Sequence, residues 1–180
     1  MAARTLVLGG ARSGKSAHAE GLLPADADVD YVATARRDPD DAEWSRRIAA
    51  HVERRPASWR TVEAGPDELA AVLLAAGPDR WLLVDDLATW LTAALDDAGA
   101  WERDPAALAA VAERCAELVD AVARCRGRLV LVSAEVGLGV VPGTRSGRLF
   151  RDELGALNAR LAEGCDDVLL LVAGIPLRLR

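Results

Sequence analysis

The sequence has 180 residues, of which 51% are hydrophobic and only 4% aromatic, and its formal net charge is -6. This length predicts one domain, spanning residues 1–180, with an aliphatic core, and the acidic balance argues against a general affinity for nucleic acid or anionic membranes. No apolar run approaches the ~20 residues of a membrane span, no signal peptide precedes the first strand, and the three cysteines form no C-x-x-C pair. Together these features predict a cytoplasmic protein with reduced thiols.

Strand-like and helical patterns alternate along the whole chain. Strands are expected near 4–8, 29–34, 59–63, 81–85, 128–133 and 166–172, with a last short pair around 175–180. Helices are expected at 15–23, 41–54, 66–76, 87–97, 104–125 and 146–163. Several strands are continuous apolar runs, which are typical of a sheet covered on both faces. The alternation therefore predicts an α/β fold with a mostly parallel sheet flanked by helices, and ligands at the carboxyl ends of its strands.

A phosphate-binding loop follows the first strand. The stretch GGARSGKS matches G-x-x-x-x-G-K-[ST] and lies between an apolar run and a helical pattern, which is the context the motif requires. In such a loop, backbone N–H groups point at phosphate oxygens, the lysine reaches the outer phosphates and the serine hydroxyl holds Mg2+. Lys15 is the single lysine among 22 basic residues, which favours a nucleotide site over a plain glycine-rich turn. The predicted nucleotide-binding residues of the loop are Gly9, Gly10, Ala11, Arg12, Ser13, Gly14, Lys15 and Ser16.

The expected helix at 41–54 carries a histidine among arginines. Trp44, Ile48 and His51 fall at i, i+4 and i+7, on the apolar face of that helix. By spacing alone, a histidine there is a structural residue of the core. Neighbouring guanidinium groups, however, lower the pKa of an imidazole and favour its neutral, nucleophilic form, and they also bind phosphates. The residues alone leave both interpretations open.

Acidic residues follow two of the later strands. Asp85 and Asp86 end the run that begins at Trp81, the position of a Walker-B carboxylate that holds Mg2+ opposite Ser16. An aspartate at this point also caps the helix that follows, and the doublet allows both roles; we assign Asp85 to the metal side. Glu135 lies in a glycine-containing loop after the next strand, where it faces either the same site or solvent.

The motifs narrow the class of P-loop protein. A switch-type GTPase needs N-K-x-D, and the chain has no second lysine to supply it; neither Asp85 nor Asp86 begins a D-x-x-G. A small-molecule kinase is compatible, because phosphoryl transfer needs positioning and charge stabilisation rather than a covalent group. A non-enzymatic nucleotide-binding regulator is the other alternative. A second anion-binding edge or a solvated helix face is indicated by Arg145, Arg148 and Arg151.

Further strings of residues resemble one enzyme family. After GGARSGKS come YVATA, R-I-x-x-H-x-x-x-R-P at 47–56, WRTVE at 59–63 and EVGLGVVP at 135–142, in that order. The closing stretch, LFRDELGALNARLAEGCDDVLLLVAGIPLRLR, is similar too. Over essentially its whole length the chain resembles the bifunctional adenosylcobinamide kinase/adenosylcobinamide-phosphate guanylyltransferases of cobalamin biosynthesis.

The resemblance implies a RecA-like P-loop NTPase fold and two activities. Members phosphorylate the aminopropanol hydroxyl of adenosylcobinamide with ATP or GTP, and then transfer GMP from GTP to that phosphate through a covalent GMP–histidine. The implied catalytic residues are His51, which carries the GMP, and Lys15. The resemblance also implies a homo-oligomer, typically a trimer, whose partner is the corrinoid substrate and not nucleic acid. The implied nucleotide contacts outside the P-loop are Thr34, Ala35, Arg36, Val52, Glu53, Arg54, Arg55, Glu63 and Asp85, and the implied ligands of Mg2+ are Ser16 and Asp85.

Overall fold

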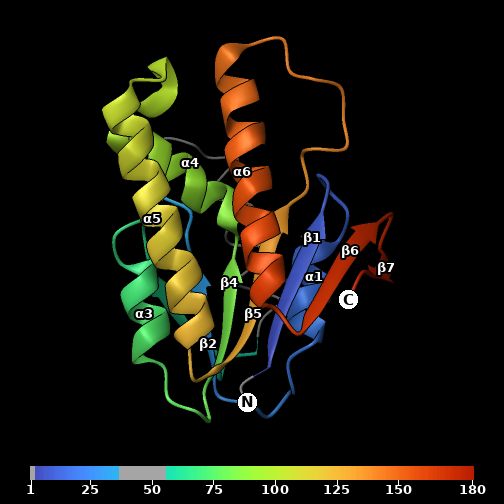
Figure 1. Ribbon diagram of the computed structural model, residues 1–180. Helices are drawn as coiled ribbons and strands as arrows, with labels where there is room; N and C mark the ends of the chain where they lie inside the picture. The colour runs from blue at the N-terminus through green and yellow to red at the C-terminus, as the bar shows by residue number, and fades with distance from the viewer. Residues whose placement is uncertain (1–2, 37–55) are drawn as a thin grey trace.

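A seven-stranded sheet with the order β3-β2-β4-β5-β1-β6-β7 forms the centre of the computed structural model, which describes residues 3–36 and 56–180 (Figure 1). Strands β1 to β6 are parallel, and β7 alone is antiparallel to its neighbour. The prediction of a mostly parallel sheet is therefore confirmed. The strands are β1 (Arg4–Gly9), β2 (Val29–Ala33), β3 (Arg60–Glu63), β4 (Trp81–Asp85), β5 (Arg128–Ala134), β6 (Asp167–Val172) and β7 (Ile175–Arg178).

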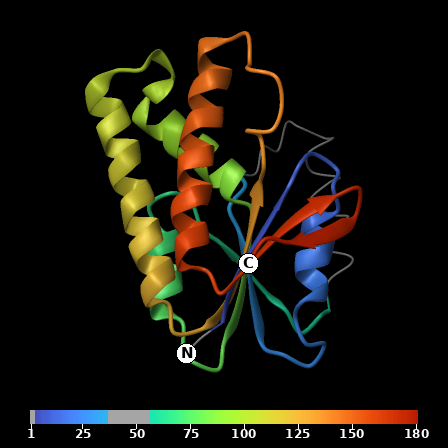
Figure 2. The same ribbon diagram turned by 45° about the vertical axis from the view of Figure 1, so that its right-hand side comes forward.

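Helices cover both faces of this sheet (Figure 2). One face carries α3 (Leu69–Ala75), α4 (Leu87–Ala98), α5 (Pro105–Arg124) and α6 (Arg145–Gly164), and the other carries α1 (Lys15–Gly21). A single 3-10 turn, η1 (Ala100–Glu102), follows α4. The helix expected at 41–54 lies outside the described residues. Within the described part of the chain, no helix is both long and apolar enough to cross a membrane.

The core is divided in two by the sheet, because successive side chains of a strand point to opposite faces. In β1, Leu6 and Leu8 pack with the four-helix layer, whereas Val7 packs with α1. All three side chains are buried, which explains why β1 is a continuous apolar run. The strand that leads into the P-loop is thus held from both sides.

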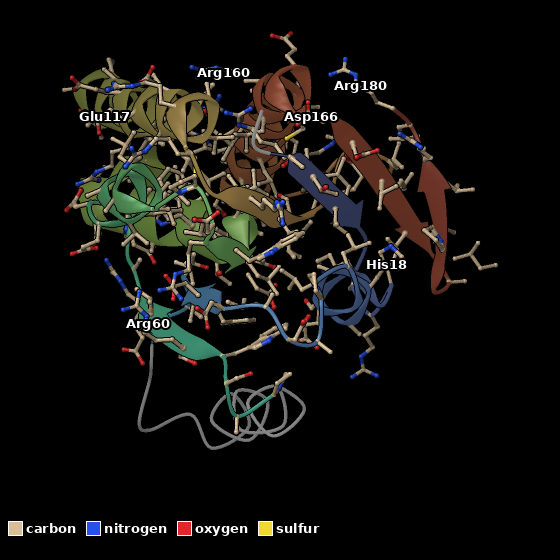
Figure 3. The ribbon with its side chains drawn as sticks, turned by 90° about the horizontal axis from the view of Figure 1, so that it is seen from below. His18, Arg60, Glu117, Arg160, Asp166 and Arg180 are labelled. Carbon is tan, nitrogen blue, oxygen red and sulfur yellow. The ribbon has the colours of Figure 1, made fainter. Side chains whose placement is uncertain are left out.

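Two arginines, Arg4 at the start of β1 and Arg180 after β7, bind the C-terminal ends of the long helices α5 and α6. The Arg4 guanidinium donates to the carbonyl oxygens of Val122 (2.7 Å), Ala123 (2.6 Å) and Cys125 (3.2 Å) at the end of α5. Arg180 likewise donates to a carbonyl in the last turn of α6 (2.6 Å; Figure 3). A cation at a helix C-terminus binds the unpaired carbonyls and offsets the negative end of the helix dipole. These contacts fix α5 and α6 to the sheet.

Candidate nucleotide-binding site

The P-loop leaves the carboxyl end of β1 and turns tightly into α1. Arg12 (φ 55°) and Gly14 (φ 85°) adopt the left-handed conformation. At Gly9 a Cβ atom would lie 2.4 Å from the Ser13 Oγ and 3.1 Å from the Leu171 carbonyl oxygen, so that only glycine fits there. The glycines of the motif therefore serve the close wrapping of the loop that a phosphate cradle requires.

Lysine and serine, the last two residues of the motif, begin α1. The Lys15 Nζ lies 3.4 Å from the Gly10 carbonyl oxygen, so the Lys15 side chain folds back over the P-loop. The Ser16 hydroxyl donates to Asp85 Oδ1 at 3.1 Å. Asp85 is the last residue of β4, which is separated from β1 by β5. The P-loop serine and the Walker-B carboxylate, expected on opposite sides of one metal ion, thus face each other.

A tyrosine that the sequence analysis did not single out also holds Asp85. The Tyr31 hydroxyl, from β2, donates to Asp85 Oδ2 at 2.6 Å, so both carboxylate oxygens have a donor. Tyr31 is 3% exposed. A buried tyrosine hydroxyl needs a hydrogen-bond partner, and this requirement was the one available signal in the YVATA string.

The second aspartate of the doublet has a different role. Asp86 is the N-cap of α4, where its Oδ1 accepts hydrogen bonds from the Thr89 N–H (2.8 Å) and the Thr89 hydroxyl (3.0 Å). Thr34 supports the same corner, because its hydroxyl donates to the Asp86 carbonyl at 2.6 Å. Burial raises the pKa of the Asp86 carboxyl, and the charge of Asp85 raises it further. The two roles considered for this doublet are therefore divided between its members.

The remaining predicted nucleotide contacts that fall within the described residues lie at the carboxyl ends of the same strands or just after them. Thr34 and Ala35 follow β2, and Glu63 ends β3, where it pairs in register with Ala33. Arg36 forms an ion pair with Asp97 near the end of α4, which lowers the pKa of Asp97. The predicted residues outside the described part of the chain are His51, Val52, Glu53, Arg54 and Arg55. The other histidine, His18, is half-buried on α1 (Figure 3).

The loop between β5 and α6 is anchored to the P-loop and to α6. The Glu135 N–H donates to the Gly9 carbonyl at 3.1 Å, while the Glu135 carboxylate accepts from the Gly137 N–H at 2.6 Å. Arg148 donates to the carbonyls of Pro142 and Gly143, both at 2.9 Å. Arg151 donates to the Gly137 carbonyl at 3.1 Å. Two of the three regularly spaced arginines of α6 therefore hold this loop.

The turn between β6 and β7 supports the P-loop from the other side. Ala173 (φ 52°) and Gly174 (φ 80°) form the two-residue connection, both in the left-handed region that such hairpin turns require. The Gly174 N–H donates to the Ser13 carbonyl at 3.0 Å. A Cβ on Gly14 would lie 3.7 Å from the Gly174 Cα. The phosphate loop is thus packed against the C-terminal hairpin.

The arrangement fits a Mg2+–nucleotide complex. Mg2+ prefers hard oxygen ligands, and it is commonly held by one or two protein oxygens together with substrate phosphates and water. The Ser16 hydroxyl and the Asp85 carboxylate supply such oxygens side by side at the mouth of the P-loop. Among the described residues, no group of three or more His, Cys, Asp or Glu side chains could hold a metal ion.

Comparison with known proteins agrees with this arrangement. The family model described as cobinamide kinase / cobinamide phosphate guanyltransferase matches residues 5–179. The bifunctional adenosylcobalamin biosynthesis protein CobP of Pseudomonas aeruginosa is 45% identical over 98% of this chain and 97% of its own. The CobU proteins of the same description from Salmonella typhimurium and Escherichia coli are 39% and 38% identical, each over 97% of this chain and 98% of their own.

A solved structure shares the fold. It is an ATPase from the type III secretion system of pathogenic bacteria, with a TM-score of 0.58 and 14% identity over 94% of this chain. The chain spans about half (51%) of the length of that ATPase. At this identity the similarity concerns the fold alone, and it agrees with the P-loop NTPase fold expected from the sequence.

Proposed function

Because the chain belongs to the cobinamide kinase / cobinamide phosphate guanyltransferase family, we propose that it phosphorylates adenosylcobinamide and then transfers GMP from GTP to the new phosphate, giving adenosylcobinamide-GDP. The observation that carries the proposal is the contact between the P-loop Ser16 and Asp85. It is found in a chain that is 38–45% identical to bifunctional relatives over nearly its full length. ATP and GTP are the proposed nucleotides of the first step, and GTP that of the second.

The kinase step depends on positioning and on charge. The N–H groups of the P-loop hold the phosphates, and Lys15 offsets the charge that develops on the transferred phosphoryl group. Ser16 and Asp85 would hold Mg2+, which neutralises phosphate charge when bound. Tyr31 keeps the Asp85 carboxylate turned toward Ser16 through its 2.6 Å hydrogen bond. The aminopropanol hydroxyl of the corrinoid attacks the terminal phosphorus, its proton is lost, and nucleoside diphosphate leaves.

The guanylyl step adds a covalent intermediate on His51. The neutral imidazole attacks the α-phosphorus of GTP; a P–N bond forms, the bond to the bridging oxygen breaks, and pyrophosphate leaves. The phosphate of the corrinoid then attacks the same phosphorus and frees His51. Lys15 and Arg54 or Arg55 offset the developing charge. Since residues 51–55 lie outside the described part of the chain, these assignments rest on the R-I-x-x-H-x-x-x-R-P string.

The direct test is transfer of label from GTP to the protein. Purified protein with Mg2+ and no corrinoid is incubated with GTP labelled on either the α- or the γ-phosphate and is then denatured. We expect α-label alone to be retained, in an acid-labile and base-stable form, as a phosphoramidate should be. The His51→Ala variant should lose it, whereas the matched variant His18→Ala should keep it.

The alternatives predict other outcomes of the same experiment. A plain P-loop small-molecule kinase retains no label and transfers the γ-phosphate to its acceptor. A non-enzymatic nucleotide-binding regulator retains no label and shows negligible turnover. Retention of α-label by His51→Ala at the wild-type level would refute the assignment of the nucleophile.

Length and composition support two further proposals, and the family resemblance supports a third, the oligomer. We propose that residues 1–180 form one domain, that the protein is cytoplasmic, and that it assembles as a homo-oligomer, with a trimer favoured. Light scattering on the eluting protein gives its molar mass directly. A mass near 19.0 kDa, that of one chain, would contradict the oligomer.

A further inference from the structure

An open groove lies between η1 and the first turns of α6, apart from the P-loop. Its volume is about 800 Å³, and its walls include the partly exposed rings of Trp101 and Phe150 together with the charged side chains of Glu102 and Arg145. The Trp101 Nε1–H donates to Asp96 Oδ1 at 2.6 Å, which fixes the indole ring. The groove thus offers two aromatic side chains flanked by one charge of each sign.

This groove lies at the same end of the sheet as the phosphate site. In Figure 1 the start of α6 and the end of α4 rise above the carboxyl ends of β1 and β5. The segment 135–144 connects the two places directly. At one end the Glu135 N–H binds the Gly9 carbonyl of the P-loop, and at the other the Thr144 hydroxyl caps α6 by accepting from the Gly147 N–H at 3.1 Å.

The connecting loop is apolar and exposed, yet it is held in place. Leu138, Val140 and Val141 are 80%, 96% and 59% exposed. The loop backbone is fixed by the guanidinium groups of Arg148 and Arg151, described above. Exposed apolar side chains that form a patch mark a site of interaction, and scattered ones do not. Here three of them lie within four residues, between the phosphate site and an aromatic groove.

We infer that this loop and groove together bind the macrocycle of the corrinoid acceptor, an inference that rests on the proposed function. The acceptor hydroxyl must reach the terminal phosphate at the P-loop, so the rest of the molecule must lie on the carboxyl end of the sheet. A corrin is a broad disc whose edge carries methyl groups and amide side chains. The apolar loop and the aromatic rings suit the methyl groups, and Glu102, Arg145 and the hydroxyls of the first turn of α6 suit the amides.

The position of the loop favours the substrate over a second copy of the chain. A second copy seated on residues 138–141 would lie close to the P-loop, because the same loop begins at Glu135, whose N–H binds the Gly9 carbonyl. A substrate bound there is instead held where its reactive arm must be. Ligand pockets typically have volumes of about 300–1,000 Å³ and combine apolar walls with a few polar groups. The groove has these properties.

The test measures corrinoid binding separately from nucleotide binding. Binding of dicyanocobinamide is measured by calorimetry, and the KM for adenosylcobinamide and kcat are measured in the kinase reaction with saturating ATP. The variants are Trp101→Ala in the groove and Val140→Ala on the loop, whose 96% exposure makes a folding defect implausible as a cause of altered binding. The matched control is Leu74→Ala, which removes an exposed leucine (40%) from α3. The affinity for a fluorescent GTP analogue is measured for every variant.

We expect Trp101→Ala to raise the corrinoid Kd and KM about tenfold or more, as truncation of a buried aromatic anchor does. Val140→Ala should raise them severalfold, and Leu74→Ala should leave them unchanged. The GTP affinity of all three variants should equal that of the wild type. Because the groove holds the substrate and not the reacting atoms, KM should change far more than kcat.

Three outcomes would overturn the inference. Wild-type turnover of adenosylcobinamide with unchanged corrinoid Kd and KM in both variants would refute the groove and leave the proposed function intact. A change of oligomeric mass in Val140→Ala without a change in corrinoid binding would assign the loop to contact between copies. Absence of any corrinoid binding or turnover in the wild type would refute the groove together with the proposed function.

Discussion

Asp85 and Asp86 are adjacent, and replacement of each by asparagine is expected to affect a different property: kinase activity for Asp85 and stability for Asp86. Asp85 faces Ser16 and Tyr31, whereas Asp86 caps α4. Asparagine caps a helix as well as aspartate does, so Asp86→Asn keeps the hydrogen bond from the Thr89 N–H. Asp85→Asn removes the negative charge from the proposed metal side. The pair therefore separates the role of a helix cap from that of a metal ligand.

The pH dependence of stability follows from the raised pKa of Asp86. An acid whose pKa is higher in the folded state stabilises the fold when it is protonated; this contribution is complete below the unfolded-state pKa and is lost as pH rises through the folded-state value. At pH 7, well above the unfolded-state pKa, the raised pKa of Asp86 therefore reduces the stability of the fold, and Asp86→Asn removes that cost. We expect the variant to be at least as stable as the wild type at pH 7, and its advantage to shrink as the pH falls toward about 4.

The contribution of the helix cap to stability is given by the difference in the free energy of unfolding between Asp86→Asn and Asp86→Ala. Alanine leaves the Thr89 N–H without its 2.8 Å acceptor, a loss of about 1 kcal/mol. In a chain of this size that corresponds to a difference of roughly 2–4 °C in Tm. Both quantities are read from thermal denaturation at several pH values from about 3.5, below the unfolded-state pKa, up to about 8.

Kinase activity supplies the second half of the comparison. With adenosylcobinamide and ATP, Asp85→Asn should lower kcat by about 10²–10³-fold, the cost of removing one preorganised electrostatic group. Asp86→Asn should stay within a few-fold of the wild type. The division of roles would be refuted if Asp86→Asn lost activity to the same extent as Asp85→Asn, or if it were less stable than the wild type at pH 7.

Three further predictions concern other contacts. Tyr31→Phe removes one of the two donors to Asp85 and should lower kcat about tenfold in the kinase assay. The free energy of unfolding should fall by about 1.5 kcal/mol, the low end for a hydrogen bond to a charged group. An unchanged kcat would show that Ser16 suffices to orient the carboxylate. Arg4→Ala should lower Tm by about 4–8 °C through a loss of about 2 kcal/mol at the end of α5, whereas the exposed Arg126→Ala should not change it. Burial raises the pKa of Cys115 to about 11, so at pH 8 this thiol should not react with a disulfide reagent until the protein is unfolded; rapid reaction of the folded protein would contradict its burial.

Local patterns predicted most of the described secondary structure. The P-loop strand expected at 4–8 extends over Arg4–Gly9, and the helix expected at 104–125 is α5 at Pro105–Arg124, begun by the N-cap Asp104 and a proline. These elements were predictable because hydrophobic periodicity and capping residues are local properties. The helix expected from 66 begins only at Leu69, after a turn over residues 66–68. The turn η1 was not predicted, since three residues carry no periodic pattern.

The site was predictable only in part, for a physical reason. Motif spacing indicated Lys15, Ser16 and Asp85, because each lies at or shortly after the end of an apolar strand that is recognisable in the sequence. The bond between Tyr31 and Asp85 joins residues 54 positions apart, and it exists only because β2 and β4 are neighbours in the sheet. Likewise, Trp101 and Phe150 line one groove only after α4 and α6 have packed on the same face of the sheet. Contacts of this kind depend on strand order and helix packing, which no local pattern contains.

The central place of β1 also has a consequence for how the protein is made. β1 (Arg4–Gly9) is synthesised long before both strands that flank it in the sheet, β5 (Arg128–Ala134) and β6 (Asp167–Val172). At about 5–20 residues per second, roughly 6–24 s separate the synthesis of β1 from that of β5. During that time β1 lacks both of its neighbouring strands, and its apolar side chains, which are later buried on both faces of the sheet, are open to binding by chaperones. Because the P-loop is packed against the turn between β6 and β7, we expect nucleotide to bind only after these strands have joined β1, and not to assist the early stages of folding.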